Sequence, residues 1–320
     1  MKLSRKGRPI SGSISSVRLD IFQRTRVTVR DQRIFIAKLI LAATLITSGA
    51  VLTFFDSLTL SIVGMVVLGF MYTHCVELQH QCLHHSAFVR PSSHRYVGFL
   101  LGLPLLVCYS HYRVRHLQHH KYLGTENDSE FFGFDPRAPL TKRMMLRGLF
   151  DYGRLLSVVK DIYHCMRGDW RYTEGQISDR RRRDVVREHL LMGIIIATAG
   201  VLCVLGFWEP IVKLWLIPLL IAVPLHFLVE IPEHILCDVD STDVLRNTRS
   251  VTASRISAWF TNGNNFHVEH HAAMTVPMHN LRERHTEVRR RALHVSRGYP
   301  QFYGLLFAAM RKGKRKGSVG

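Results

Sequence analysis

Three tight groups of histidine are the residues in this sequence whose types and spacing could do chemistry. The chain has 19 histidines among 320 residues. The groups are HQCLHH from His80 to His85, HLQHH from His116 to His120 and HVEHH from His267 to His271. On a helix, residues i, i+3 and i+4 share one face, so each H-x-x-H-H string places three imidazoles on one stripe. Two copies of this string are far more than this histidine content produces by chance.

The chemistry that these side chains favour is the binding of transition metals. Neutral imidazole suits Zn, Cu, Fe and Ni, whereas Mg and Ca prefer oxygen. Eight imidazoles are the first candidate ligands: His80, His84, His116, His119, His120, His267, His270 and His271. A structural zinc takes four ligands, so this set is too large for one zinc and sufficient for two ions of higher coordination number. Because open positions on iron bind and activate O₂, we expect a centre of two redox-active metal ions.

One further histidine is a candidate for the same centre. His234, in the string EIPEH, follows the last long apolar stretch and is expected to complete the set of ligands. Ligating imidazoles usually donate their second N–H to a carboxylate or carbonyl, and the acids near the groups are candidates for that role, among them Asp128, Glu230 and Glu269. Asn264 and Asn265 precede the third group and could hydrogen-bond a metal-bound water. The roles of three other histidines stay open: His85, His111 and His226.

The elements that must position these histidines are membrane spans. Four apolar stretches cover residues 34–55, 58–72, 190–207 and 211–229, and none carries more than one charge. A bilayer core about 30 Å thick needs roughly 20 helical residues. A fifth apolar run, 96–110, is short and contains Gly98, Gly102 and Pro104, which favours a re-entrant or interfacial helix. We therefore expect an all-α integral membrane protein with four transmembrane helices in two hairpins and a cytosolic helical cap that carries the histidine groups.

The distribution of basic residues predicts which side of the membrane holds the histidines. Short loops at 56–57 and 208–210 join the spans in pairs, so residues 1–33, 111–189 and 232–320 share one side. These three segments hold 39 of the 43 Lys and Arg residues, and the short loops hold none. Such basic segments stay in the cytoplasm, which places the histidine groups and both termini there. We divide the chain into a basic N-terminal segment (1–33), a membrane domain (34–310) and a polybasic tail (311–320).

Composition excludes several other classes of protein. The formal charge of +19 is 43 basic minus 24 acidic residues, but no aromatic and basic module accompanies it, so nucleic acid is not an expected partner. The 47% of hydrophobic residues excludes a disordered chain. The six cysteines form no C-x-x-C pair, so neither a zinc ribbon nor a redox dithiol is expected.

From about Phe70 to His279 the sequence resembles the membrane fatty acid desaturase superfamily, whose relatives include carotenoid ketolases and hydroxylases and the integral-membrane alkane hydroxylases. The resemblance is carried by HQCLH, HLQHH and HVEHH and by the strings around them, RHLQHHKYLGTENDSEFF and NNFHVEHHAAMTVPMHNL. It implies a cytosolic cap that holds two iron ions and an O₂-dependent attack on an unactivated C–H bond of a lipid chain. In related desaturases one more histidine after the last span completes the cage, and His234 best fits that position.

Two features depart from or extend the family pattern. His85 adds a third histidine to the first group, where many relatives have a small residue. No segment resembling cytochrome b5 is fused at either end, so a separate ferredoxin or cytochrome b5-type protein is expected to supply electrons.

Three functions are consistent with these features. The first is a desaturase that acts on a lipid acyl chain, and the second is a hydroxylase or ketolase of a carotenoid, alkane or sphingoid lipid with the same di-iron site. The third, a membrane metal transporter, predicts histidines or acids at mid-depth in the spans. Only His226 is a candidate for such a position, so the sequence favours the enzymes.

Overall fold

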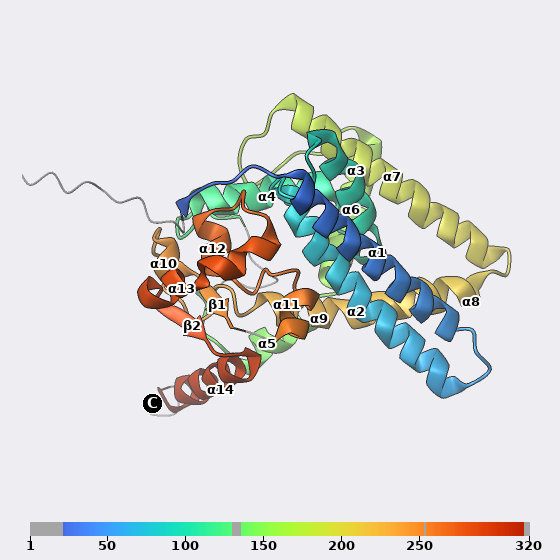
Figure 1. Ribbon diagram of the computed structural model, residues 1–320. Coiled ribbons are helices and arrows are strands. Elements are labelled where there is room, and N and C mark those ends of the chain that lie inside the picture. Colours follow the sequence, from blue (N-terminus) through green and yellow to red (C-terminus); the bar gives the residue numbers. More distant parts are fainter. Residues whose placement is uncertain (1–21, 130–135, 253, 317–320) are drawn as a thin grey trace, which may run out of the picture.

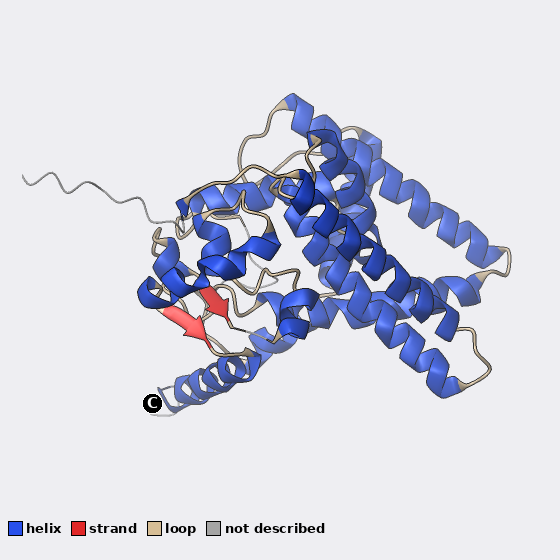
Figure 2. Ribbon diagram, viewed as in Figure 1, coloured by secondary structure: helices blue, strands red, loops and turns tan. Residues whose placement is uncertain are grey.

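A computed structural model describes residues 22–129, 136–252 and 254–316, in which nearly every regular element is a helix (Figure 1, Figure 2). Four helical segments are long and apolar enough to cross a membrane. These are α1 (Val29–Leu52), α2 (Leu58–Leu83), α7 (Asp179–Val204) and the continuous series α8 (Trp208–Ile211), η3 (Val212–Leu216) and α9 (Ile217–Glu230). The predicted all-α fold and its four spans are thereby confirmed.

The observed helices extend beyond the apolar stretches at their polar ends. A capping box formed by Thr28 and Asp31 starts α1 five residues before the apolar run. Ser57 caps α2 by accepting a hydrogen bond from the Leu60 N–H. That helix continues past residue 72 to Leu83, because no Gly or Pro interrupts it there. The extension matters for function, since it carries His80 on the last turn of a spanning helix.

The two hairpins lie side by side with their short loops at the same end (Figure 1). In the first hairpin the helices touch through glycines: a Cβ added at Gly64 would lie 2.6 Å from the Gly49 carbonyl oxygen. Helix α2 also packs closely on α9, where a Cβ at Gly69 would lie 2.6 Å from Ile221 Cγ2. The side chains that α1 and α7 turn outward are apolar, for example Ile40 and Ile194, as a lipid environment requires.

The fifth apolar run is two helices rather than one. Helix α3 (Pro91–Gly102) and the 3₁₀ turn η2 (Leu103–Leu105) end at Leu106, which has a positive φ of 57°. Helix α4 (Tyr109–Tyr122) then leaves at 99° to the first segment. The bend requires glycine at position 102, where a Cβ would lie 2.1 Å from the Val107 carbonyl oxygen. This bend turns α4, which carries the second histidine group, away from the direction of α3.

The remaining elements form the cap and its surroundings. They are α5 (Lys142–Leu149), α6 (Gly153–Arg167), α10 (Val244–Asn247), α11 (Arg255–Phe260), α12 (His267–Ala272), η4 (Met278–Asn280), α13 (Leu281–Arg291) and α14 (Tyr299–Lys316). Two short strands, β1 (Arg249–Val251) and β2 (His294–Ser296), pair in parallel. They lie at the end of the molecule opposite the hairpin loops (Figure 2). Helix α14 crosses the boundary expected at residue 311, and residues 1–21 of the expected N-terminal segment lie outside the described residues.

Candidate metal centre

All nine candidate histidines meet where the ends of three helices face α12. His80 is on the last turn of α2 and His84 is its C-cap residue. The second group lies on α4, the third lies on α12, and His234 lies in the turns that follow α9. The structure divides the nine into a five-histidine group and a four-histidine group, and within each group one ligand atom per residue lies within 4.8 Å of all the others.

The five-histidine group consists of His80, His84, His116, His120 and His270. Its imidazoles converge through their Nε2 atoms. The Nε2 atom of His116 lies 2.6 Å from that of His80 and 2.8 Å from that of His84. The Nε2 atoms of His120 and His270 are 3.1 Å apart. The Nε2 atoms of residues from α2, α4 and α12 therefore converge at one place.

The four-histidine group consists of His119, His234, His267 and His271. The Nε2 atom of His267 lies 3.0 Å from those of both His234 and His271. The two groups are neighbours, because the rings of His120 and His271 stack with their centroids 4.1 Å apart. The arrangement offers two adjacent ligand sets rather than one large cage.

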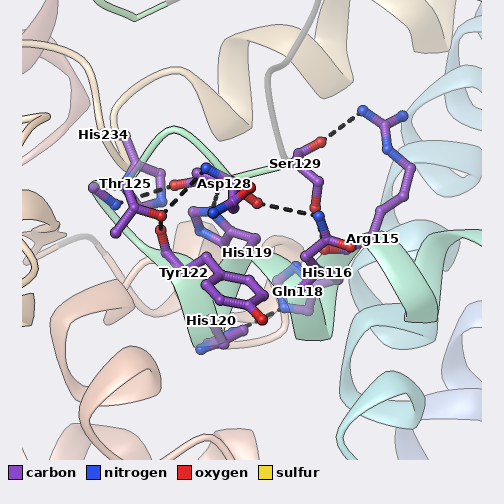
Figure 3. A network of polar contacts seen from close by, with 12 residues as sticks. Arg115, His116, Gln118, His119, His120, Tyr122, Thr125, Asp128, Ser129 and His234 are labelled. Carbon is purple, nitrogen blue, oxygen red and sulfur yellow. Dashed lines mark hydrogen bonds and ion pairs between the residues drawn. The ribbon is translucent and has the colours of Figure 1, made fainter. Parts of the chain in front are cut away.

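Hydrogen bonds behind the four-histidine group fix which nitrogen of His119 and of His234 carries the proton. The Nδ1 atom of His119 donates to Asp128 Oδ1 at 2.7 Å, a contact that Figure 3 shows. The Nδ1 atom of His234 donates to the Asn247 carbonyl at 3.0 Å, since a carbonyl can only accept. The Nε2 atom of each of these two rings then carries no proton, and its lone pair is directed into the group. Converging lone pairs repel one another unless a cation lies among them, so the donor set fits a metal ion.

Burial keeps the imidazoles on α12 in the form that binds metal. Burial lowers the pKa of His267, His270 and His271 well below the usual 6.5, and the neighbouring imidazoles lower it further. All three rings are therefore neutral at physiological pH. Metal ligation needs this neutral state, because a protonated imidazole has no free lone pair.

A second layer of polar residues holds the ligands, and the sequence predicts only some of its members. Asn264, expected near a metal-bound water, instead donates to Glu233 at 2.7 Å and accepts from His267 Nδ1 at 3.2 Å. The Asn265 side chain donates to the Val251 carbonyl at 2.7 Å, so it supports the backbone of the cap rather than the metal centre. The Asn247 carbonyl behind His234 carries no signal in the sequence, because any residue type offers the same group.

Glu269 lies between two ligand residues and anchors α12 to the cap. It accepts a hydrogen bond from His285 Nδ1 at 2.6 Å and another from the Ser250 hydroxyl. The carboxylate is fully buried. The sequence indicates Glu269 as a candidate support but does not indicate His285 as its partner, because the chain between them gives no hint that α13 folds back onto α12.

The three histidines whose roles were open lie outside both groups. His85 has a positive φ of 54° and stacks on His94. His226 bonds Glu230 at 3.0 Å, and these two with Glu77 form a separate buried cluster. Glu230, one of the acids that could support the ligands, thus pairs with His226, and α9 ends at this residue, so that the chain turns before His234. His111 lies with Asp161 and His189.

A cavity of about 420 Å³ lies beside the five-histidine group. Apolar residues from α2, α6 and α9 form part of its lining, among them Val76, Leu155 and Phe227. Tyr112 also lines it, and the Tyr112 ring lies 6.3 Å from the ring of His80 and 5.6 Å from that of His116. The ring of Tyr112 therefore connects the cavity wall to the five-histidine group. The volume is in the range of ordinary ligand pockets.

Comparison with known proteins agrees with this geometry. A sequence model described as "Fatty acid desaturase" matches residues 57–303, which include all nine histidines. The chain is also similar to an sn-1 oleoyl-lipid 12-desaturase of Arthrospira platensis, with 25% identity over 235 residues. That match covers 68% of this chain and 65% of the relative, slightly less than two thirds of the relative's length.

Proposed function

Because the chain belongs to the fatty acid desaturase family, we propose that it is a membrane oxidoreductase that introduces a double bond into a lipid acyl chain. The observation that carries the proposal is the convergence of nine buried or half-buried imidazoles into two adjacent ligand sets. The relative in Arthrospira platensis is named for desaturation of an oleoyl lipid, which supports an acyl chain within a lipid as the substrate.

Each group would hold one iron ion. When bound, the two irons supply O₂-dependent oxidation strong enough to remove hydrogen from an unactivated C–H bond. The protein keeps the imidazoles neutral and holds their rings in the orientation that metal binding requires. Asp128 holds His119, the Asn247 carbonyl holds His234 and Asn264 holds His267, each through the Nδ1 atom. Such partners set the orientation and basicity of metal-bound histidines.

The cavity beside the five-histidine group is the place for the acyl chain. Its apolar wall favours methylene groups by about 0.8 kcal/mol for each one buried. Tyr112 lines the cavity and its ring lies 5.6 Å from that of His116, so chain carbons that lie against this ring would be near the ligand set. Positioning of the chain there would select the bond that is oxidised, because two hydrogens must leave neighbouring carbons.

We place the histidine centre and both termini on the cytoplasmic side. The distribution of basic residues supports this orientation, since 39 of 43 lie in the segments on the side of the centre. Electrons would come from a separate ferredoxin or cytochrome b5-type protein. The excess of positive charge on that side suits an acidic partner, because complementary charge speeds and orients docking.

One observation favours the alternative of a hydroxylase or ketolase acting on a carotenoid, alkane or sphingoid lipid. The cavity wall carries charged and polar side chains beside its apolar ones, including Asp151, Arg154 and Asp161. A substrate with its own polar groups would satisfy them better than a plain acyl chain. The two activities use the same ligand set and differ in their products.

The test is lipid profiling by mass spectrometry in a bacterial host of known lipid composition. A desaturase yields lipids that have lost two hydrogens, and a hydroxylase yields lipids that have gained one oxygen. His119→Ala and His270→Ala, one from each group, should abolish either product and lower bound iron. The control is His164→Ala, because His164 forms an exposed pair with Asp169. Full activity and full iron in both ligand variants would refute the assignment.

A further inference from the structure

We propose that His111, Asp161 and His189 form a third metal site, which takes a zinc-type divalent cation and goes beyond the proposed oxidation chemistry. One residue comes from each of α4, α6 and α7. One ligand atom from each lies within 4.8 Å of the other two. All three residues also line the cavity described above. Of the three helices that carry them, only α4 also contributes ligands to the nine-histidine centre.

The separations in this cluster suit a bound ion better than direct hydrogen bonds. Asp161 Oδ2 lies 3.6 Å from His111 Nδ1 and 3.6 Å from His189 Nε2. Both distances are too long for N–H···O hydrogen bonds, which have their mode near 2.9 Å. Two ligand atoms of one tetrahedral zinc, each about 2.1 Å from the ion, lie roughly 3.4 Å apart. Asp161 Oδ2 therefore lies at nearly the distance from each of the two nitrogens that ligands of one ion would have.

The protonation of His189 gives a second and independent reason. Its Nδ1 atom donates to the Val185 carbonyl at 3.0 Å, so in the neutral ring the Nε2 atom carries a lone pair. That lone pair faces the carboxylate of Asp161, which is also an electron donor. The side chain of His189 is only 1% exposed, so its lone pair is largely removed from bulk solvent. A cation between them removes the repulsion.

A hydrogen bond from Trp170 holds the Asp161 carboxylate in position to bind the ion. Asp161 Oδ1 accepts a hydrogen bond from the Trp170 indole N–H at 3.0 Å, which leaves Oδ2 for the two imidazoles. The Trp170 ring also packs against both histidines, with centroid separations of 5.5 Å to His111 and 6.3 Å to His189. Supports of this kind, behind both a histidine and a carboxylate, are typical of built metal sites.

The charged groups nearest the cluster already have partners of their own. Arg115, one turn along α4 from His111, bonds the Ser129 carbonyl at 2.8 Å (Figure 3). It also bonds Glu174 at 3.0 Å. Glu188, next to His189 in the chain, accepts from Arg95 at 2.8 Å and from the Ser110 N–H at 2.7 Å. Asp161 is thus left as the anionic partner of the two imidazoles.

Three protein ligands leave an open coordination position, as in zinc sites that bind a water or a substrate oxygen. Because all three residues line the cavity, that position faces the space that a lipid would occupy. The ion would also tie α4 to α6 and α7. The sequence does not predict this site, because its three residues lie on three different helices and no spacing within the chain indicates that they meet.

The experiment is a zinc titration of the iron-loaded full chain in detergent, with iron and zinc per chain measured after desalting. The wild type should bind one zinc in addition to its iron. Asp161→Asn and His111→Ala should each weaken zinc binding at least tenfold while leaving iron unchanged. The matched controls are Asp169→Asn and His164→Ala, which alter an exposed histidine–aspartate pair. His164 lies on α6, as Asp161 does, and Asp169 follows the end of that helix. They should bind zinc like the wild type.

A second readout separates loss of binding from loss of folding. Cobalt in this site should quench the fluorescence of the adjacent Trp170, and this quenching should be absent from Asp161→Asn and His111→Ala, whose iron content stays that of the wild type. The proposal is overturned if Asp161→Asn and His111→Ala bind as much zinc as the controls, or if the wild type binds none. Failure of the proposed oxidation chemistry would look different, since lipid profiles would stay unchanged while the zinc equivalent remained.

Discussion

The hydrogen bond between Asp128 and His119 gives the sharpest test of the nine-histidine centre. The two atoms are 2.7 Å apart, and the side chains are only 3% and 8% exposed. A buried hydrogen bond to a charged group contributes about 1.5–3 kcal/mol. At 1.4 kcal/mol per factor of ten, Asp128→Ala should weaken metal binding roughly 10- to 100-fold. The loss should fall on the ion held by the four-histidine group, because His119 belongs to that group.

The assay is competition between the purified chain and a metal chelator of known affinity. Asp128→Ala should lose one of its two ions at a chelator concentration that the wild type tolerates. Asp128→Asn should show a smaller effect, because the amide oxygen can still accept from Nδ1 but carries no charge. Asp169→Ala is the matched control, since Asp169 accepts from an exposed histidine at 2.9 Å. Equal metal retention in Asp128→Ala and Asp169→Ala would refute the reasoning.

Further measurements test the packing and electrostatics around the centre. Gly64→Ala should destabilise the first hairpin by about 1–3 kcal/mol, because a Cβ there meets the Gly49 carbonyl at 2.6 Å. Gly200→Ala on α7 has nothing within 4 Å and should be neutral or slightly stabilising, so equal unfolding of the two variants in detergent would contradict the close helix contact. Glu269→Gln should raise the iron requirement for activity several-fold, because the buried carboxylate accepts from His285 at 2.6 Å; an unchanged requirement would exclude a supporting role. In the metal-free chain, stability should fall as the pH drops below about 6.5, since burial lowers the pKa of His267 and His271 in the folded state and only the unfolded chain takes up protons there. Thermal unfolding that is equal at pH 8 and pH 5.5 would count against this linkage. Removal of metal by a chelator should itself lower the unfolding temperature, because an ion that binds only the folded chain stabilises it.

The local features of this protein could be predicted from its sequence because they depend on short stretches of chain. The spans follow from runs of apolar residues, and their ends follow from cap residues such as Ser57. Eight of the nine ligand candidates follow from histidine spacing, and His234 follows from its position after the last apolar stretch. The bend at Leu106 could not be predicted, because it depends on the fit of Gly102 against the Val107 carbonyl. The partners of His234 and His285 also escaped prediction, since both are brought in by segments distant in the chain.

What the sequence by itself determined is which histidines stay together. Residues at i and i+4 differ by about 40° around a helix, while i+3 lies about 100° from i+4. The pairs His80 with His84, His116 with His120, and His267 with His271 each remain in one group. The i+3 residues, His119 and His270, cross to the other group.

Only the tertiary structure decided which pairs combine. His270 joins the pairs from α2 and α4, and His119 joins the pair from α12 and His234. This exchange requires α4 and α12 to face each other with their i+3 residues toward the opposite group. Helix spacing fixes angles within one helix, but the relative placement of two helices depends on the packing of all the chain between them.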